Sequence, residues 1–422
     1  MKKWLLLYIL LPIVVLAQNI EPDKIYVSSI HTVKLFQENN QESLPLINLN
    51  SNEQLELHFD DIDENAKNYY YSFKLCNANW QPADLSSFDY IKGYQQQRLS
   101  LYRYSSIALT KYVHYTAMLP DKNSIPTRSG NYLLMVFLNG DPTQLAFTKR
   151  FYVVNSKVMI TGRIMQPFDS QIIQTHQKLQ FSLDVSQLNA PNPVQQISLS
   201  AAQNNKWSDA ITSFQPAFIR GSVLEYSGET DCLFEAGKEY RWADLRSFRY
   251  LSERIDKIDK SQQPNLLTLK PDGNRNSLRY LFYSDYNGWM NIGTTEQINT
   301  WWQTDYAFVK FVYVPDGNQP LIGKDIYISG ELTQNLCNEN SKMTYNASRG
   351  AYEKILFLKQ GYYSYCYQTK DTDKPEAHAS PAATEGNYWE TENDYTIMVY
   401  YRSYSGRHDE LVGVANINSR LR

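Results

Sequence analysis

The sequence lacks the short motifs that mark common catalytic and nucleotide-binding sites. Its 422 residues contain no GxSxG, no GxxxxGK[ST] and no GxGxxG. These absences exclude a nucleophile elbow, a P-loop and a dinucleotide fingerprint of the usual form. A pair of carboxylates for glycoside cleavage stays open, because its members need not be close in sequence. Nothing in the sequence selects such a pair, so we expect no catalytic residues and no enzyme activity.

Cysteine and histidine are both scarce. The four cysteines contain no CxxC pair, and only the last two are close enough to share a small domain: Cys76, Cys232, Cys337 and Cys366. Four cysteines allow three full pairings, and buried free thiols are an equally good alternative. No two of the six histidines stand three to five residues apart. The sequence therefore predicts no zinc pair, no other metal site and no cofactor.

Charge of either sign is not in excess. The chain has 41 Lys and Arg against 44 Asp and Glu, a net charge of −3. A nucleic-acid-binding protein needs a face dominated by basic residues, and none stands out. We therefore expect no nucleic-acid partner.

Long apolar runs are absent except at the N-terminus. MKKWLLLYILLPIVVLAQ has two lysines, an apolar run and a small-residue exit at Ala17, which is typical of a secretory signal peptide over residues 1–17. A membrane anchor is the alternative, but the run is short and contains Pro12. We expect an exported mature chain with no transmembrane segment of its own.

Tyrosine is the abundant residue. The chain has 33 Tyr, 17 Phe and 8 Trp, and residues 69–94 read YYYSFKLCNANWQPADLSSFDYIKGY. Tyrosine suits a half-buried pleated surface, so the excess favours strands. LQFSLDVS (179–186) alternates apolar and polar residues, as does YVHYTAML (112–119), whereas NYLLMVFL (131–138) is apolar on both faces and predicts a central strand.

These patterns predict an all-β protein with three consecutive β-sandwich domains, immunoglobulin-like or early-set-like, after the signal peptide. Turn and connector sequences place the domains at 18–155, 156–315 and 316–422. LSERIDKIDKSQQPN (251–265), inside the middle domain, has a helical period and predicts a short helix or a long loop.

Two polar features invite a functional interpretation. FDDIDEN (59–65) has acids at alternating positions but lacks the glycine and the final glutamate of a calcium loop, which favours a solvated acidic loop after a strand. His114 lies between two tyrosines on the expected outward face of its strand. We interpret it as a structural residue.

The aromatic excess allows two binding functions besides core packing. Trp301-Trp302 or Tyr362-Tyr363 could supply a platform for sugars, although successive strand residues point to opposite faces. Rigid aromatic rings could instead anchor a protein partner. Most of the rings we expect to find inside the sheets.

An ordered series of segments resembles one known family. FDDID, YYYSFKLCNANWQPADLSSFDYIKGY, YVHYTAMLP, SGNYLLMVFLNGD and KRFYVV resemble, in order, the first domain of the type IX secretion plug family. GKEYRWADLRSFRY, YSDYNGWMNI, DYAFVKFVYV and the tail YYRSYSGRHDELVGVANINS continue the similarity over nearly the whole mature chain. One departure is Leu75, where the family resemblance leads us to expect a histidine before the cysteine. From YISGELT (327–333) through GYYSYCYQT (361–369), the third domain also loosely resembles the early β-sandwich found beside glycan-acting enzymes.

The resemblance implies a periplasmic protein, monomeric when free, at the inner face of the outer membrane of Bacteroidota-type bacteria. It would bind the large translocon β-barrel of the type IX secretion system and close its pore when no cargo passes. Trp80, Tyr90 and Tyr94 lie between strand signals, and we predict that they bind the partner. A carbohydrate-binding β-sandwich protein of the cell envelope is the alternative.

Overall fold

The computed structural model describes residues 20–374 and 376–420. The expected signal peptide lies outside these residues. Strands dominate, with only two α-helical turns, α1 (Ser87–Tyr90) and α2 (Pro193–Gln196), and three short 3-10 turns in the described part of the chain. The all-β prediction is confirmed, and the strands form several sheets with three large hydrophobic cores between them.

The first sandwich holds the tyrosine-rich stretch. One sheet has the order β1-β3-β8-β7 and the other β2-β11-β10-β4-β6. Their strands are β1 (Ile30–Gln37), β2 (Leu46–Asn48), β3 (Leu55–Asp61), β4 (Tyr69–Cys76), β6 (Gln97–Arg98), β7 (Leu101–Tyr104), β8 (Val113–Leu119), β10 (Gly130–Leu138) and β11 (Leu145–Val154). A small ribbon of β5 (Ile91–Gly93) and β9 (Ser124–Pro126) closes one end.

Strand β4 shows why this stretch is rich in aromatic residues. Tyr69, Tyr71, Phe73 and Leu75 alternate into the core between the two sheets, and Tyr69 packs edge-on against Phe59 with ring centroids 5.2 Å apart. Leu75, where a histidine was expected, is fully buried. Strand β10 is buried along nearly its whole length, which confirms the central strand expected at 131–138.

The second sandwich joins segments that are distant in sequence. One sheet contains β12 (Met159–Met165), β13 (His176–Asp184), β15 (Phe218–Arg220), β16 (Val223–Tyr226) and β17 (Leu233–Glu235). The facing sheet pairs β14 (Ile197–Gln203) with the C-terminal hairpin, β28 (Asp394–Tyr401) and β29 (Glu410–Asn418). One hydrophobic core fills the space between them.

The third sandwich is formed by the intervening residues. One side contains β18 (Arg241–Asp244), β22 (Met290–Ile292), β24 (Lys324–Ser329) and β27 (Gly361–Asp371). The other contains β19 (Ile255–Asp259), β20 (Leu266–Leu269), β21 (Asp272–Gly273), β23 (Tyr306–Val314), β25 (Thr344–Asn346) and β26 (Ala351–Lys359). Its core draws only on residues 243–367.

Strand pairing therefore divides the chain differently from the linear order expected from the sequence. Residues 306–314 and 361–371 belong to one core, so no boundary between sheets falls at 315/316. Strands β28 and β29 return to pair with β14, which makes the second sandwich discontinuous. Residues 255–259 form strand β19 rather than a helix, because Ile255 is buried and the strand pairs with β20.

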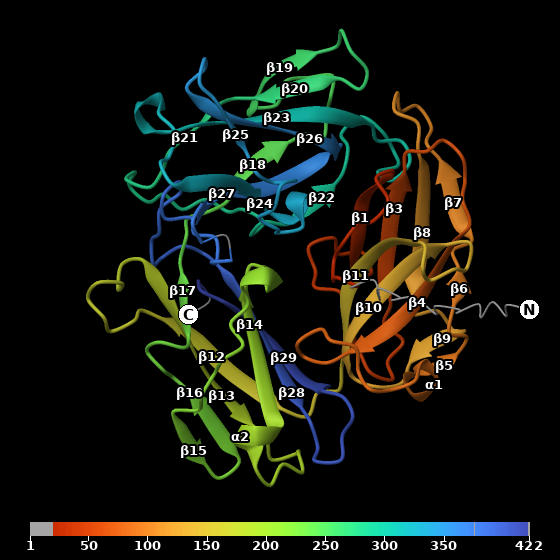
Figure 1. Ribbon diagram of the computed structural model, residues 1–422, viewed down its shortest axis with the longest axis vertical. Coiled ribbons are helices and arrows are strands. Elements are labelled where there is room, and N and C mark those ends of the chain that lie inside the picture. Colours follow the sequence, from red (N-terminus) through yellow and green to blue (C-terminus); the bar gives the residue numbers. More distant parts are fainter. Residues whose placement is uncertain (1–19, 375, 421–422) are drawn as a thin grey trace, which may run out of the picture.

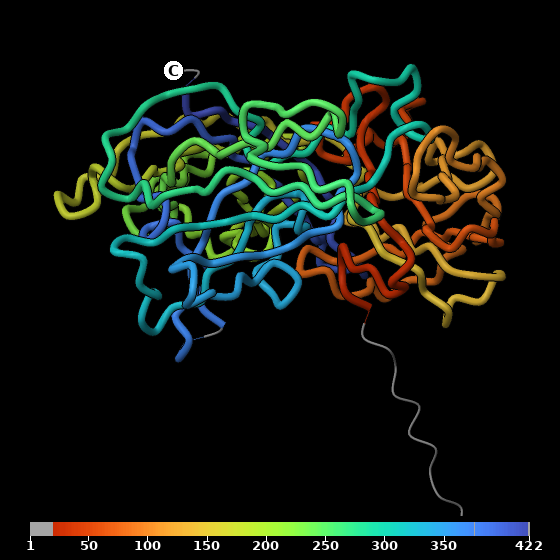
Figure 2. Tube along the Cα trace, turned by 90° about the horizontal axis from the view of Figure 1, so that it is seen from above, coloured from red at the N-terminus to blue at the C-terminus, as the bar shows by residue number. Residues whose placement is uncertain are grey.

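The three sandwiches lie side by side. In Figure 1 the first sandwich stands on the right, the third at the upper left and the second at the lower left, with the C-terminal hairpin between the second and the first. Figure 2, turned by 90°, shows the red-to-orange segment on one side of the body and the green-to-blue segments on the other. The first sandwich thus has a junction with each of the other two.

Candidate functional site

A buried cluster of charged and aromatic side chains joins the first sandwich to the third. We call Asp60, His58, His114, Tyr306 and Lys359 the Asp60 cluster; the first three lie on β3 and β8, and the last two on β23 and β26. All five are under 9% exposed, and Lys359 is separated from Asp60 by 299 residues. The acidic run at 59–65 was expected to be a solvated loop. That was wrong for its first two acids, since Asp60 and Asp61 are buried in β3.

The Asp60 carboxylate has a full set of donors. Its Oδ1 accepts from His114 Nδ1 at 2.7 Å, and its Oδ2 accepts from the Tyr306 hydroxyl at 2.5 Å and from Lys359 Nζ. Lys359 Nζ also donates to the carbonyl of Trp301 at 2.6 Å, and it lies 4.3 Å from the centroid of the Tyr112 ring. The face of β8 that carries His114 is therefore covered by the third sandwich and not by solvent.

The electrostatics of the cluster follow from burial and pairing. Burial alone would raise the pKa of Asp60, but Lys359 and His114 hold that pKa below its ordinary value. Burial lowers the pKa of Lys359, and Asp60 opposes that shift. Burial lowers the pKa of His114, and burial together with His114 lowers the pKa of His58 to about 2. At neutral pH the cluster thus contains one carboxylate, one ammonium and two neutral imidazoles.

The two imidazoles form a chain of contacts between two carboxylates. His58 Nδ1 lies 3.0 Å from His114 Nε2, and His58 Nε2 lies 3.1 Å from Glu56 Oε2. The three contacts from Glu56 to Asp60 need three ring protons, but two neutral imidazoles supply only two. Asp60 is more deeply buried than Glu56, so the two ring protons lie in the contacts nearer Asp60. His114 Nδ1 donates to Asp60, and His58 Nδ1 donates to His114 Nε2. The contact between His58 Nε2 and half-buried Glu56 is left without a proton.

A second set of contacts strengthens the same junction. Lys34 is buried, and its Nζ donates to Glu331 Oε2 at 2.7 Å and to the Met290 carbonyl at 2.8 Å. The side-chain amide of Gln41 donates to the Ile292 carbonyl at 3.1 Å and accepts from the Ile292 N–H at 2.9 Å. Gln41 thereby makes the two hydrogen bonds that a neighbouring strand would make to β22.

The junction of the first and second sandwiches is formed by the CNANW turn and the C-terminal hairpin. The Tyr400 hydroxyl donates to Asn131 Oδ1 at 2.9 Å, and Arg402 donates to Asn77 Oδ1 at 2.8 Å. The N–H of Ala78 donates to Asp409 Oδ2 at 2.9 Å. Two segments more than 300 residues apart therefore hold each other, and no local sequence pattern indicated this.

The three residues expected to bind a partner lie in different environments. Trp80 has a φ of +65°, is half-buried, and packs edge-on against Tyr152 at 5.6 Å with Arg150 over its ring. Tyr90 is 2% exposed and belongs to the first core. Tyr94 is 67% exposed. The structure does not bring the three residues together, and their role as partner anchors stays a prediction. Of the three rings, only that of Tyr94 is largely exposed to solvent.

The expected sugar platforms are also occupied by the protein itself. The Trp301 indole stacks on His58 with ring centroids 3.8 Å apart, and Arg103 lies over the Trp302 ring at 4.8 Å. Tyr363 is 1% exposed, and Tyr362 meets Tyr286 edge-on at 5.0 Å. Neither doublet offers a free planar surface of the size that a sugar ring needs.

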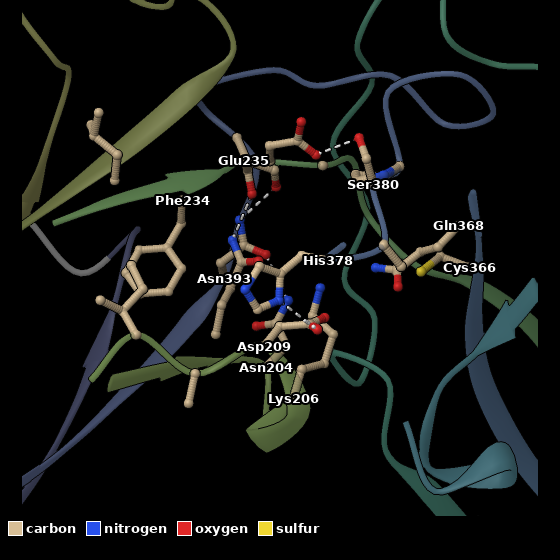
Figure 3. Close-up of a pocket in the computed structure, with 18 of the residues that line it drawn as sticks. Asn204, Lys206, Asp209, Phe234, Glu235, Cys366, Gln368, His378, Ser380 and Asn393 are labelled. Atoms are coloured by element: carbon tan, nitrogen blue, oxygen red, sulfur yellow. Dashed lines mark hydrogen bonds and ion pairs between the residues drawn. The ribbon is translucent and has the colours of Figure 1, made fainter. Parts of the chain in front are cut away.

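A cavity of about 540 Å³ lies between the second and third sandwiches. Figure 3 shows His378 beside Asp209 and Ser380 beside Glu235, pairs whose polar atoms are 3.2 Å and 2.7 Å apart. Burial raises the pKa of the Cys366 thiol in its wall to about 12, so the thiol stays protonated. The cavity holds polar groups but no activated nucleophile at Cys366.

Glu385, also in the cavity wall, is committed to structural contacts. Its carboxylate accepts from Arg241 and Arg275, and from the N–H of Tyr367 at 2.9 Å. Burial alone would raise the pKa of Glu385, but the two guanidinium groups hold it at about 2. A carboxylate that stays ionised and fully paired cannot serve as a general acid near neutral pH.

Metal and membrane signals are missing from the part of the chain that the structure describes. Within residues 20–374 and 376–420, no three His, Cys, Asp or Glu side chains come together as metal ligands. None of the helices described is long and apolar enough to cross a bilayer. The four cysteines are unpaired, which answers the question that the sequence left open.

Comparisons with known proteins identify the first sandwich. Residues 30–155 match the family described as type 9 secretion system plug protein 1st domain, which confirms the resemblance to the type IX secretion plug family. This family is a plug-like structural domain and not a family of enzymes. No curated protein matches the chain.

A solved structure has the same fold over nearly the whole chain. The crystal structure of a hypothetical protein from Parabacteroides merdae superposes with a TM-score of 0.90 at 29% sequence identity. The match covers 95% of this chain and 100% of that one. The arrangement of all three sandwiches is therefore shared with that protein.

Proposed function

We propose that this chain, whose residues 30–155 match the first domain of the type IX secretion plug family, binds the outer-membrane translocon barrel of that system and closes its pore when no cargo is passing. It works from the periplasmic side, against the inner face of the outer membrane, after removal of a signal peptide. Closure needs no cofactor and no chemical step. The observation that carries the proposal is the match of residues 30–155 to the plug first domain.

The junctions of the first sandwich support this function physically. A wide barrel leaves an aqueous lumen, and closing it requires a body that keeps its shape under thermal motion. The Asp60 cluster, the Lys34–Glu331 pair and the contacts of Asn77 with the C-terminal hairpin tie the first sandwich to both others. Interfaces between domains are commonly mobile, and buried ion pairs of this kind favour one relative orientation.

The first test is physical association. The mature chain, carrying an affinity tag at its C-terminus, should co-purify with the large barrel from detergent-solubilised envelope. Recovery without any barrel protein, in cells that express the translocon, would count against the proposal. Lys257→Glu, a charge reversal at an exposed residue of β19, is the control variant. With the same tag and purification, it should recover the barrel as well as the wild-type chain does.

The second test is pore closure. Deletion of the gene should make the outer membrane permeable to molecules too large for ordinary porins, and re-expression should restore the barrier. Unchanged permeability in cells with an assembled, idle translocon would contradict closure but not association.

The alternative, a carbohydrate-binding protein of the envelope, makes a different prediction. It requires retardation of the purified chain in native gels that contain polysaccharide. The proposed plug should migrate equally in gels with and without polysaccharide.

A further inference from the structure

We propose that the open edge of β7 is a docking site for an extended, acidic segment of the translocon partner, which adds to the β1-β3-β8-β7 sheet as a further strand. This inference rests on the proposed function and specifies how the first sandwich attaches. It is carried by three features of residues 101–111: the backbone direction of β7, the exposed apolar side chains of β7 and the loop after it, and the charge of this segment.

The backbone of β7 has hydrogen-bonding groups that no strand takes up. Strand β7 ends its sheet, and within residues 20–374 and 376–420 the one strand that pairs with it is β8. The N–H of Ser105 donates to the Tyr112 carbonyl at 2.8 Å, which fixes the alternation of the antiparallel ladder. Arg103, two residues earlier, therefore bonds to β8, whereas the N–H and C=O of Tyr102 and Tyr104 point away from β8 to the open edge.

The side chains around this edge are apolar and exposed, unlike those of a protected edge strand. All four residues of β7 are exposed, and the loop that follows adds Ile107 and Leu109, both more than half exposed. Figure 1 shows β7 at the outer margin of the first sandwich, and the turn that follows it meets the third sandwich, where the N–H of Ser106 donates to the Trp302 carbonyl at 2.8 Å. Soluble proteins usually blunt such edges with charges, prolines or a covering loop. Arg103 is the only charged residue in β7, and its guanidinium lies over Trp302.

The charge of the segment selects the partner's chemistry. Residues 101–111, which are β7 and the loop that follows it, contain two basic residues, Arg103 and Lys111, and no aspartate or glutamate, in a chain whose net charge is −3. The nearby Asp305 is engaged, because its two oxygens accept from the N–H groups of Leu109 and Thr110 at 2.9 Å and 3.0 Å. An acidic strand would therefore meet complementary charge, and main-chain hydrogen bonds would supply affinity.

Two substitutions at one position test the backbone contact. Tyr104→Pro removes an N–H that points to the open edge, whereas Tyr104→Thr removes the same ring and keeps the N–H. Both should fold, because proline is tolerated where the N–H of an edge strand faces solvent. Binding of the full mature chain to purified, detergent-solubilised translocon should be roughly tenfold weaker for Tyr104→Pro than for Tyr104→Thr. Equal binding of the two would overturn the inference.

A charge substitution tests the same edge without touching its backbone, in case the proline variant does not fold. Lys111→Glu should weaken translocon binding roughly fivefold at low salt, and the difference should vanish at high salt. Lys257→Glu, on the third sandwich, is the matched control and should change nothing. Equal effects of the two reversals, or none, would contradict an acidic occupant at β7.

Other occupants give distinguishable results. If the edge pairs with a second copy of this chain, sedimentation should show a dimer that Tyr104→Pro abolishes, and the inference is overturned. If it binds a lipid surface, vesicles of phosphatidylglycerol should retain the proline and threonine variants equally, which also overturns it. If wild-type chain does not bind the translocon at all, the proposed function fails before this inference is reached.

Discussion

The imidazole of His58 lies flat on the indole of Trp301, with ring centroids 3.8 Å apart and an angle of 2° between the planes. His58 belongs to β3 of the first sandwich, and Trp301 to the loop that leads into β23 of the third. Trp301 also stacks on His114, with ring centroids 5.6 Å apart, so its indole lies against both imidazoles of the Asp60 cluster. Aromatic packing and a buried ion pair thus act at one junction, and the following predictions address that junction and the cores beside it.

Removing one partner of the buried ion pair should be strongly destabilising. In Asp60→Asn the ammonium of Lys359 stays buried without a counter-charge, and we expect a loss of about 3–5 kcal/mol in the free energy of unfolding. Lys359→Met should have a similar effect, and the double variant should lose less than the sum. Urea unfolding of the four proteins measures this; strictly additive losses would show that the pair does not interact.

The exposed pair of Lys324 and Asp371 is the matched control. Their side chains are 39% and 44% exposed. Asp371→Asn should change the free energy of unfolding far less than Asp60→Asn does, because solvent screens such pairs.

Glu56→Gln should stabilise the protein at neutral pH. The amide N–H₂ of glutamine can donate to His58 Nε2, which lacks a proton in its present contact, while the amide oxygen still accepts from the N–H of Asn39. One satisfied hydrogen bond corresponds to about 1 kcal/mol. A rise in the thermal midpoint at pH 7.5 is expected; a fall would mean that His58 carries two ring protons and pairs with Glu56 as a cation.

Mild acid should destabilise the fold through the two histidines. Their folded-state pKa values are lowered, that of His58 to about 2, while the unfolded values stay near 6.5. Below pH 6.5 the unfolded chain therefore binds more protons than the folded one, and the free energy of unfolding decreases as the pH is lowered. Between pH 6.5 and 5, His58 should lower the free energy of unfolding by about 1.6 kcal/mol, and His114 should add a loss of the same sign. Urea midpoints should fall over this range, and less steeply in His58→Gln.

The cysteines should react slowly in the native protein. Burial raises the pKa of Cys76, Cys232 and Cys366 to about 12, and that of Cys337 to about 11. Alkylation at pH 7.5 should label Cys337 first, because it is the least buried of the four, and all four only in denaturant. Mass spectrometry of the non-reduced protein should show no disulfide. A bridged pair in the folded protein would contradict this assignment.

Local sequence was enough to predict much of the first sandwich. Alternation along β8, and along β13 of the second sandwich, indicated which side chains enter the cores, because successive strand residues face opposite sides of a sheet. The continuous apolar run of β10 indicated burial on both faces for the same reason. Such predictions need only the two-residue period with which side chains alternate between the faces of a strand, and every strand has this period.

The junctions between the sandwiches could not be predicted in this way. The acids of β3 were assigned to solvent, because a run such as FDDIDEN is usually solvated and its buried partners lie 246 and 299 residues away. The helical period at 251–265 was misleading, since β19 gains its stability from pairing with β20 and not from its own periodicity. Trp80 and Tyr90 were placed among binding residues because turns often carry them, yet the fold packs the first at a junction and the second in a core.

The sequence by itself determined the all-β class, the faces of the regular strands and the resemblance to a plug family, because each depends on residue type and short-range period. Only the tertiary structure decided that the last two strands return to the second sandwich, that Asp60 meets Lys359, and that β7 is left with an open edge. The physical reason is that pairing between distant strands and the satisfaction of buried charges depend on three-dimensional neighbours, which no local pattern encodes.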